Sequence, residues 1–159
     1  MGVCLRYCHN RDEAKAALNL TYYKILRKLD TYRPEVPLDA WMRRIAINTL
    51  IDEYRKQRKG KDLIETMAFE GKNTYKTPIT HNDAEYRADA AQLEALVQQL
   101  PDMSRKVFNL FAIDGYAHLE IADMLGISEG TSKWHVNSAR KKLQLALTAL
   151  RQRDAKPHA

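Results

Sequence analysis

Side chains that could bind another molecule are concentrated between Thr131 and Lys141. Successive residues of a helix are turned by about 100°, so a helix here would present an aromatic ring, an amide, hydroxyl groups and cations on one outward face. Those groups can hydrogen-bond to base edges and neutralise phosphates, which predicts a surface that binds a nucleic acid. The predicted contact residues are Thr131, Lys133, Trp134, His135, Asn137, Ser138 and Lys141.

A helix-turn-helix pattern would position this face. The segment from His118 to Leu147 predicts two helices joined at Gly126, which can adopt the positive φ of a tight turn, and Ser128 is a suitable N-cap for the second helix. Such a unit can lay its second helix in the major groove of DNA. The alternative is an ordinary solvated helical hairpin, which the outward face disfavours. The residues expected to pack inward are Ile121, Ala122, Leu125, Ser132, Val136, Ala139 and Leu143.

A second candidate surface lies on the helix predicted over Leu38 to Arg58. An aromatic ring beside cations and an amide provides the stacking, phosphate contacts and base-edge contacts that single-stranded nucleic acid requires. For Trp41 alone, burial under a neighbouring helix is an equally good interpretation. The run RKQRK from Arg55 to Lys59 adds four cations in five residues. The residues that share this predicted face are Trp41, Arg44, Asn48, Asp52 and Arg55.

Charge is unevenly distributed along the chain of 159 residues, whose net charge is +6. Residues 1–60 carry 13 basic and 7 acidic side chains, and residues 101–159 carry 9 and 6. Residues 61–100 between them carry 4 basic and 7 acidic side chains. Two basic blocks separated by an acidic segment predict two contact surfaces for a polyanion.

Several classes of protein are disfavoured by what the sequence lacks. No apolar run approaches the ~18 residues that would span a bilayer, and no signal-peptide pattern is present, so we expect a cytoplasmic protein without membrane insertion. Cys4 and Cys8 lie one helical turn apart, and His9 is next to Cys8. A metal site is one interpretation of this group, but the favoured one is two helix cysteines in a reducing compartment. Clustered carboxylates, zinc-binding spacings and Gly-rich phosphate loops are absent, and Asp52 and Glu53 would point about 100° apart. We therefore predict no catalytic residue, no metal and no cofactor.

The remaining pattern predicts helices throughout. The sequence NRDE from Asn10 to Glu13 has the spacing of a capping box and opens a helix to about Leu29, ended by the prolines between Tyr32 and Pro37. Another helix resumes near Asp89 and stops before Pro101, and Asp102 is expected to cap the next, which ends at Asp114 and Gly115. The apolar stripe expected on the first helix is Ala14, Leu18, Tyr22, Ile25 and Leu29.

The fold class predicted is all-α, with two small helical domains joined by a flexible linker. The first domain is expected over residues 1–59 and the linker over residues 60–85, which lack sustained periodicity. The second domain, with the helix-turn-helix, is expected over residues 86–152, followed by a polar tail over residues 153–159.

These segments in this order resemble a bacterial RNA polymerase sigma factor of the extracytoplasmic-function (ECF) group, over nearly the whole chain. LDTYRPEVPLDAWMRRIAINTLIDEYRK resembles the family's segment for strand melting and the downstream promoter element. GISEGT before a basic helix, preceded by LP and EIADMLG, resembles its helix-turn-helix for the upstream element. The resemblance implies promoter DNA and RNA polymerase core, through its clamp and flap, as partners, and an inhibitory anti-sigma factor. The competing hypothesis is a helix-turn-helix repressor or activator with an N-terminal sensor or dimerisation module, which would not need Trp41, Asn48 or RKQRK.

The resemblance also implies roles for individual residues. Arg44 and Asn48 match downstream-element contacts, and the loop Tyr32 to Val36, with Arg33, matches one that holds a base flipped from the melted strand. Asn19 and Tyr23 match the clamp-binding helix. That helix departs from the family at Ala16 and Asn19, where Asp and Gln are usual, and the family has about twenty more residues before Met1, which predicts a truncated first helix. The positions that match upstream-element readers are Lys133, Trp134, Asn137 and Ser138.

Overall fold

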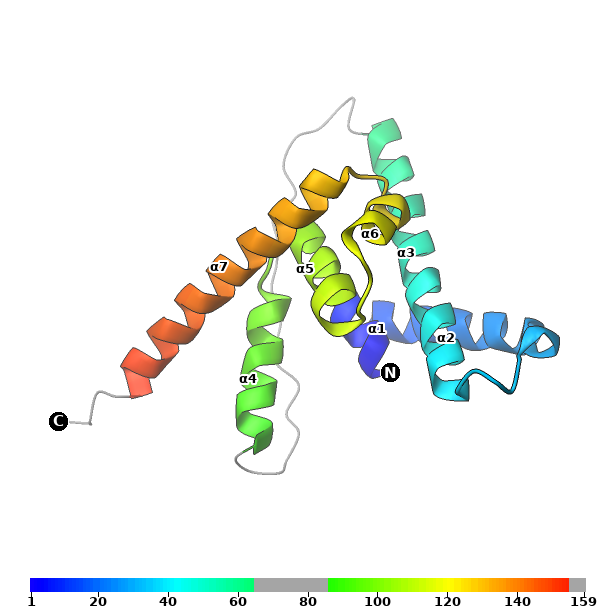
Figure 1. The fold of residues 1–159 in the computed structure, drawn as a ribbon, viewed down its shortest axis with the longest axis horizontal. Helices are drawn as coiled ribbons and strands as arrows, with labels where there is room; N and C mark the ends of the chain where they lie inside the picture. The colour runs from blue at the N-terminus through cyan, green and yellow to red at the C-terminus, as the bar shows by residue number, and fades with distance from the viewer. Residues whose placement is uncertain (65–85, 155–159) are drawn as a thin grey trace. The chain divides into compact units, whose positions relative to one another are not determined.

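The structure, a computed structural model, describes the backbone of residues 1–64 and 86–154 and the side chains of residues 1–58, 92–150 and 152. Over these residues the chain consists of helices and short connections (Figure 1), which confirms the predicted all-α fold. Contacts divide the chain into two compact units, and their described parts are residues 1–64 and 86–154. We describe each unit separately.

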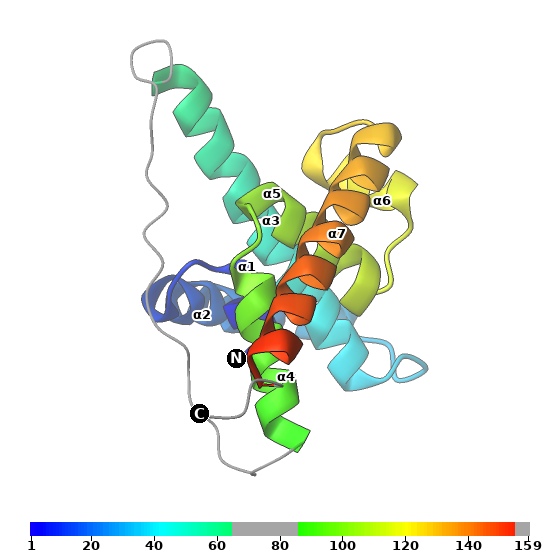
Figure 2. The same cartoon turned by 90° about the vertical axis from the view of Figure 1, so that its left-hand side faces the viewer.

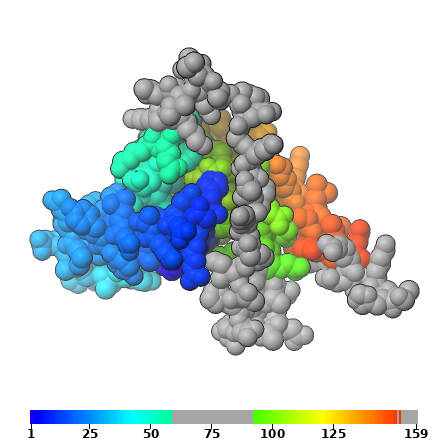
Figure 3. All heavy atoms as spheres, turned by 180° about the vertical axis from the view of Figure 1, so that it is seen from behind, coloured from blue at the N-terminus to red at the C-terminus, as the bar shows by residue number. Residues whose placement is uncertain are grey.

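The first unit contains α1 (Gly2–Tyr7), α2 (Arg11–Arg27), the short 3-10 helix η1 (Leu29–Thr31) and α3 (Leu38–Ile64). Each of α1, α2 and α3 contacts the other two. In the space-filling view of Figure 3 the blue atoms of α1 and α2 form one body with the cyan-green atoms of α3. The buried hydrophobic residues of this unit are Cys4, Tyr7, Ala14, Ala17, Ile45, Ala46, Ile47, Leu50 and Ile51.

The capping box predicted at the start of α2 is present in a variant form. The side chain of Asn10 accepts a hydrogen bond from the backbone N–H of Glu13 at 2.8 Å, as an N-cap should. The Glu13 carboxylate accepts from the backbone N–H of His9 at 3.1 Å, one residue before the N-cap, and also from the Asn10 amide at 3.1 Å. These bonds fix the turn between α1 and α2.

The buried face of α2 differs from the predicted stripe. Ala14 is buried as expected, but Tyr22 and Leu29 are exposed, and Ala17 and Thr21 are buried instead. Small side chains allow close contact between α2 and its neighbours. The buried Thr21 hydroxyl is not left without a hydrogen bond, because it donates to the carbonyl of Ala17 at 2.7 Å. Leu18 and Ile25 of the predicted stripe are half-buried, so the buried face is turned from that stripe toward Ala17 and Thr21.

Helix α3 continues to Ile64, beyond the end predicted at Arg58. The linker was predicted from residue 60 because periodicity is lost there, but a glycine such as Gly60 costs only about 1 kcal/mol relative to alanine inside a helix and does not end the helix by itself. The first residues of the predicted linker thus belong to α3, and its remaining residues, 65–85, lie outside the described part of the chain.

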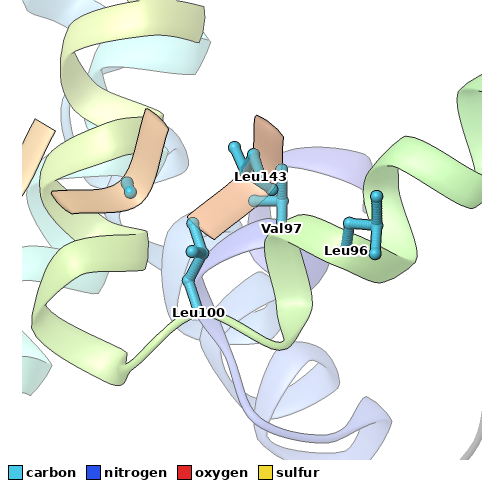
Figure 4. Close-up of a cluster of buried hydrophobic side chains, with 5 residues drawn as sticks. Leu96, Val97, Leu100 and Leu143 are labelled. Carbon is cyan, nitrogen blue, oxygen red and sulfur yellow. The ribbon is translucent and has the colours of Figure 1, made fainter. Parts of the chain in front are cut away.

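The second unit contains α4 (Tyr86–Gln98), α5 (Asp102–Phe108), the π-helical turn η2 (Asn109–Ile113), α6 (His118–Leu125) and α7 (Glu129–Asp154). Helix α4 begins three residues before the predicted start at Asp89, and α7 runs into the predicted tail. Helix α4 packs against α7, and Figure 4 shows Val97, Leu100 and Leu143 directed toward one another. The members of this cluster are Leu96, Val97, Leu100, Ala139 and Leu143.

Asp102 is not the N-cap of α5, contrary to the prediction. Pro101 occupies the cap position without a side-chain bond, and Asp102 is the first helical residue. The Asp102 carboxylate instead accepts from Arg105 at 3.0 Å and from Lys106, two cations that are both buried. Arg105 also donates to the Gln98 carbonyl at 3.1 Å, so the corner between α4 and α5 is held by charge-assisted bonds.

Candidate nucleic-acid interface

The turn between α6 and α7 has the predicted geometry. Gly126 ends α6 with φ 65°, in the left-handed region that favours glycine. The Ser128 hydroxyl accepts a hydrogen bond from the backbone N–H of Thr131 at 3.0 Å and lies 2.8 Å from the Thr131 hydroxyl. Ser128 therefore caps α7 and fixes where this helix starts.

The two sides of α7 differ as the sequence predicts. Ser132, Val136, Ala139 and Leu143 are buried, and the facing residues Ile121, Ala122 and Leu125 of α6 are buried as well. Figure 2 shows α6 beside the first turns of α7. On the other side, Trp134 is 62% exposed, so most of its indole ring is accessible to a partner. The other exposed members of the predicted set are Thr131, Lys133, Asn137 and Lys141, whereas Ser138 is half-buried.

A histidine bonded to a buried serine anchors α7 to α6. A ring nitrogen of His118 lies 3.0 Å from the hydroxyl of Ser132, which is fully buried on the inner side of α7. The imidazole of His118 stacks on Phe111, with ring centroids 4.3 Å apart, and the guanidinium of Arg140 lies over the same phenyl ring. These contacts hold the helix-turn-helix at a fixed crossing.

His135, which was expected among the contact residues of α7, is bonded to α5. Its ring is half-buried, and Nδ1 lies 2.9 Å from the hydroxyl of Ser104 on α5. Burial lowers the pKa of the His135 imidazole from its ordinary value of 6.5, which favours the neutral ring.

Lys133 forms an ion pair with Glu129, one turn earlier on α7, at 2.6 Å. Both side chains are exposed. The hydrogen bond and charge of Lys133 lower the pKa of the Glu129 carboxyl from its ordinary 4.5. One cation of the outward face is therefore already paired.

The outward face of α3 keeps its predicted polar residues accessible. Arg44, Asn48 and Arg55 are exposed, and the opposite side of α3 supplies much of the core of the first unit. Asp52, which shares this face by spacing, is paired with Lys24 of α2 at 3.1 Å. The paired carboxylate reduces repulsion toward a phosphate backbone.

Trp41 and Tyr32 lie together beside this face. The two ring centroids are 5.3 Å apart with the rings tilted by 56°, and both side chains are half-buried. The Tyr32 hydroxyl donates to the carbonyl of Val36 at 3.0 Å, which closes the loop that contains the exposed Arg33. Trp41 is therefore neither fully buried nor fully exposed, and part of the ring pair remains accessible.

The two residues expected to contact the polymerase clamp are exposed on α2. Asn19 is exposed, and Tyr23 is 56% exposed. Arg27 donates to the Tyr23 hydroxyl at 3.3 Å and places its guanidinium 5.9 Å from the ring centroid.

Among the described residues, no three His, Cys, Asp or Glu side chains are grouped so that they could hold a metal ion. Cys4 and Cys8 are both free thiols, and burial raises the pKa of the Cys4 thiol. None of the helices within residues 1–64 and 86–154 is both long and apolar enough to cross a membrane.

Two family models match the chain. The model of sigma-70 region 2 matches residues 1–60, and the model of sigma-70 region 4 matches residues 90–143. The chain belongs to the sigma-70 family. The two candidate surfaces lie within the two matched regions, and this sigma factor directs RNA polymerase core to promoters for transcription initiation. The match at residues 1–60 leaves the repressor or activator hypothesis without support.

Relatives of this sigma factor place it in the ECF group. It is 29% identical over 156 residues to the ECF RNA polymerase sigma factor SigW of Bacillus subtilis, a match that covers 93% of this chain and 82% of that protein. It is 27% identical over 156 residues to the RNA polymerase sigma-H factor of Pseudomonas aeruginosa, with 94% and 81% covered. The fold is similar to that of the sigma factor RpoE from Bartonella quintana, which was solved in complex with the anti-sigma factor NepR. The TM-score is 0.56 at 21% identity, and the match covers 92% of this chain and 88% of RpoE.

Two residues near the outward face of α7 were missed from the sequence. Glu129 could have been identified, because it lies four residues before Lys133 on a predicted helix. Ser104 could not, since it lies 31 residues from His135 and nothing in its local sequence indicates a long-range bond.

Proposed function

We propose that the outward face of α7 reads the upstream promoter element in the major groove and that the outward face of α3 binds the melted downstream strand. We call the first set the upstream face, comprising Thr131, Lys133, Trp134, Asn137, Ser138 and Lys141. We call the second set the downstream face, comprising Arg44, Asn48 and Arg55 with Trp41 and the loop residues Tyr32 and Arg33. The observation that carries this assignment is the exposure of Trp134 and Asn137 on a helix whose other side is buried.

The upstream face combines groups with different tasks. Lys133 and Lys141 can neutralise phosphates, which gives affinity without sequence preference. The Asn137 amide has both donors and an acceptor and can bond to a base edge, while the Trp134 ring can contact a thymine methyl group or a sugar. Sequence preference should therefore come from Trp134 and Asn137.

The downstream face suits an unpaired strand. Asn48 can read an exposed base edge, Arg44 and Arg55 can bind the backbone, and the tilted Tyr32 and Trp41 pair offers a ring on which a base can stack. The hydrogen bond from Tyr32 to Val36 keeps the adjacent loop in one conformation before a base arrives. This arrangement supports capture of a flipped base, for which unstacking costs a few kcal/mol.

The remaining roles are proposed on the same basis. Asn19 and Tyr23 contact the polymerase clamp, and the second unit contacts the flap. An anti-sigma factor binds the chain and blocks these surfaces, a role supported by the fold shared with RpoE, which was solved bound to NepR. We further propose that the protein acts in the cytoplasm, has no catalytic activity of its own, and is organised as two domains, whose described parts are residues 1–64 and 86–154.

Binding to duplexes of selected and scrambled sequence tests the upstream face. The selected duplex is the one most enriched from a randomised library by the unaltered chain with polymerase core. The binding free energies of the two duplexes should differ by about 1–3 kcal/mol less for Asn137→Ala than for the unaltered chain, because a base-edge contact is lost. Lys133→Ala should weaken binding to both alike, because a phosphate contact carries no sequence preference. An unchanged difference with Asn137→Ala would refute the assignment of the upstream face.

A further inference from the structure

The exposed Trp134 ring touches a neighbour that helix geometry does not provide automatically. Adjacent residues of a helix point about 100° apart, so side chains at positions i and i+1 do not normally face each other. Here the rings of Trp134 and His135 lie edge to face, with centroids 4.9 Å apart and an interplanar angle of 76°. This contact requires the imidazole to be held on the side of the indole.

A residue of another helix, Ser104 of α5, holds the imidazole of His135 in place. Nδ1 of His135 lies 2.9 Å from the hydroxyl of Ser104, and Ser104 is 3% exposed at the beginning of α5. The serine is fixed because it belongs to the corner that Asp102 and Arg105 tie together. A continuous series of contacts therefore leads from the buried corner of α5, through His135, to the exposed indole.

We propose that Ser104 and His135 are positioning residues for Trp134 and thereby determine part of the promoter specificity of this sigma factor. The inference rests on the proposed role of Trp134 in reading the upstream element. An exposed tryptophan can rotate about two side-chain bonds, and an edge-to-face ring contact restricts that rotation. Fixing the indole before DNA binds reduces the ordering that binding requires, so the preference for the correct base increases.

The second serine–histidine bond of this unit provides a matched control. Ser132 is as deeply buried as Ser104 and lies 3.0 Å from His118. His118, however, stacks on Phe111 rather than on Trp134. Ser132→Ala and Ser104→Ala each remove one buried hydroxyl from a histidine, so they should lower the free energy of unfolding similarly, but only Ser104→Ala releases the indole.

The motion of the indole can be measured without DNA. The full chain has two tryptophans, so a Trp41→Phe background makes Trp134 the only indole emitter. We expect Ser104→Ala and His135→Gln to lower the fluorescence anisotropy of Trp134 and alter its lifetime, whereas Ser132→Ala leaves both unchanged. His135→Gln keeps a group able to bond to Ser104 but removes the ring that faces Trp134, and it alters a half-buried rather than a core position.

Base preference is measured in the chain that retains Trp41. Polymerase core loaded with each variant selects from a library of duplexes with a randomised upstream element, and the bound duplexes are sequenced. Trp134→Ala should identify the base positions that depend on the indole. Ser104→Ala and His135→Gln should reduce the preference at those same positions by roughly threefold to tenfold, and Ser132→Ala should not.

Two outcomes would overturn the proposal, and they have different consequences for the reader role of Trp134. If Trp134→Ala changes no base preference, the indole is not a reader, and both its proposed function and the positioning role fall. If Trp134→Ala changes preferences but Ser104→Ala and Ser132→Ala give the same anisotropy and the same preferences, Ser104 is only structural and the reader role stands.

Discussion

Lys133 is the residue of the upstream face whose charge is already paired before DNA binds. Its ion pair with Glu129 competes with phosphate for the same ammonium group. Glu129→Gln should strengthen binding to any duplex roughly twofold at low salt, with a smaller gain at physiological salt, because the freed cation can then neutralise a phosphate. Glu94→Gln, at an exposed position on α4, makes the same change in net charge. Equal affinities of the two variants in a duplex titration would show that the pair does not restrain Lys133.

His135 makes the stability of the second unit depend on pH. Its pKa is lowered by burial in the folded chain, so the unfolded chain binds a proton at pH values where the folded chain does not. Its contribution is complete above pH 6.5 and is lost as the pH falls from 6.5 through the lowered pKa of the folded state. Denaturant unfolding between pH 7 and pH 5 should show a smaller loss of stability for His135→Gln than for the unaltered chain. His9→Gln, at an exposed position in the first unit, should show the same loss of stability as the unaltered chain. An equal loss in all three chains would contradict this account.

At the scale of elements, the turn of the helix-turn-helix rests on the backbone of one glycine. Gly126 has φ 65° and has no heavy atom within 4 Å of the position that a Cβ would occupy, so Gly126→Ala adds backbone strain without a steric clash. We expect the free energy of unfolding of the second unit to fall by about 1–2 kcal/mol. Gly130→Ala, at the second residue of α7, should instead raise it by about 0.5–1 kcal/mol, because alanine favours the helix. Denaturant titration measures both, and a change of the same sign in both variants would contradict the assigned turn.

Elements that depend on local sequence could be predicted, and those that depend on distant partners could not. Gly126, Ser128 and the buried side of α7 follow from turn chemistry, capping and helical periodicity, all of which act within a few residues. Asp102 was assigned incorrectly although its partners Arg105 and Lys106 are only three and four residues away, because the burial of these two cations depends on the rest of the folded unit. The π-helical turn η2 also had no signal in the sequence: the N–H of Asp114 bonds to the carbonyl of Asn109 at 2.9 Å, with Asn109 and Leu110 buried beneath it. The same limit applies to the Ser104 contact with His135 in the site.

At the scale of the whole molecule, the two proposed surfaces lie in separate compact units. Binding of a closed promoter should depend mainly on the upstream face, and opening of the duplex mainly on the downstream face. A change in α3 should therefore slow strand opening while leaving the upstream contacts of α7 intact, because each unit has its own buried core.

Permanganate reactivity of unpaired thymines in promoter complexes tests this division most directly. With polymerase core, Asn48→Ala should slow the appearance of reactive thymines on a double-stranded promoter. A pre-melted promoter should partly restore the complex, because the cost of unstacking, a few kcal/mol, no longer arises there. Gln57→Ala, which removes an exposed amide from the other side of α3, should behave like the unaltered chain. Closed-complex binding should be nearly equal in all three. If Asn48→Ala melts the double-stranded promoter as fast as the unaltered chain, the downstream face is structural and the account is wrong.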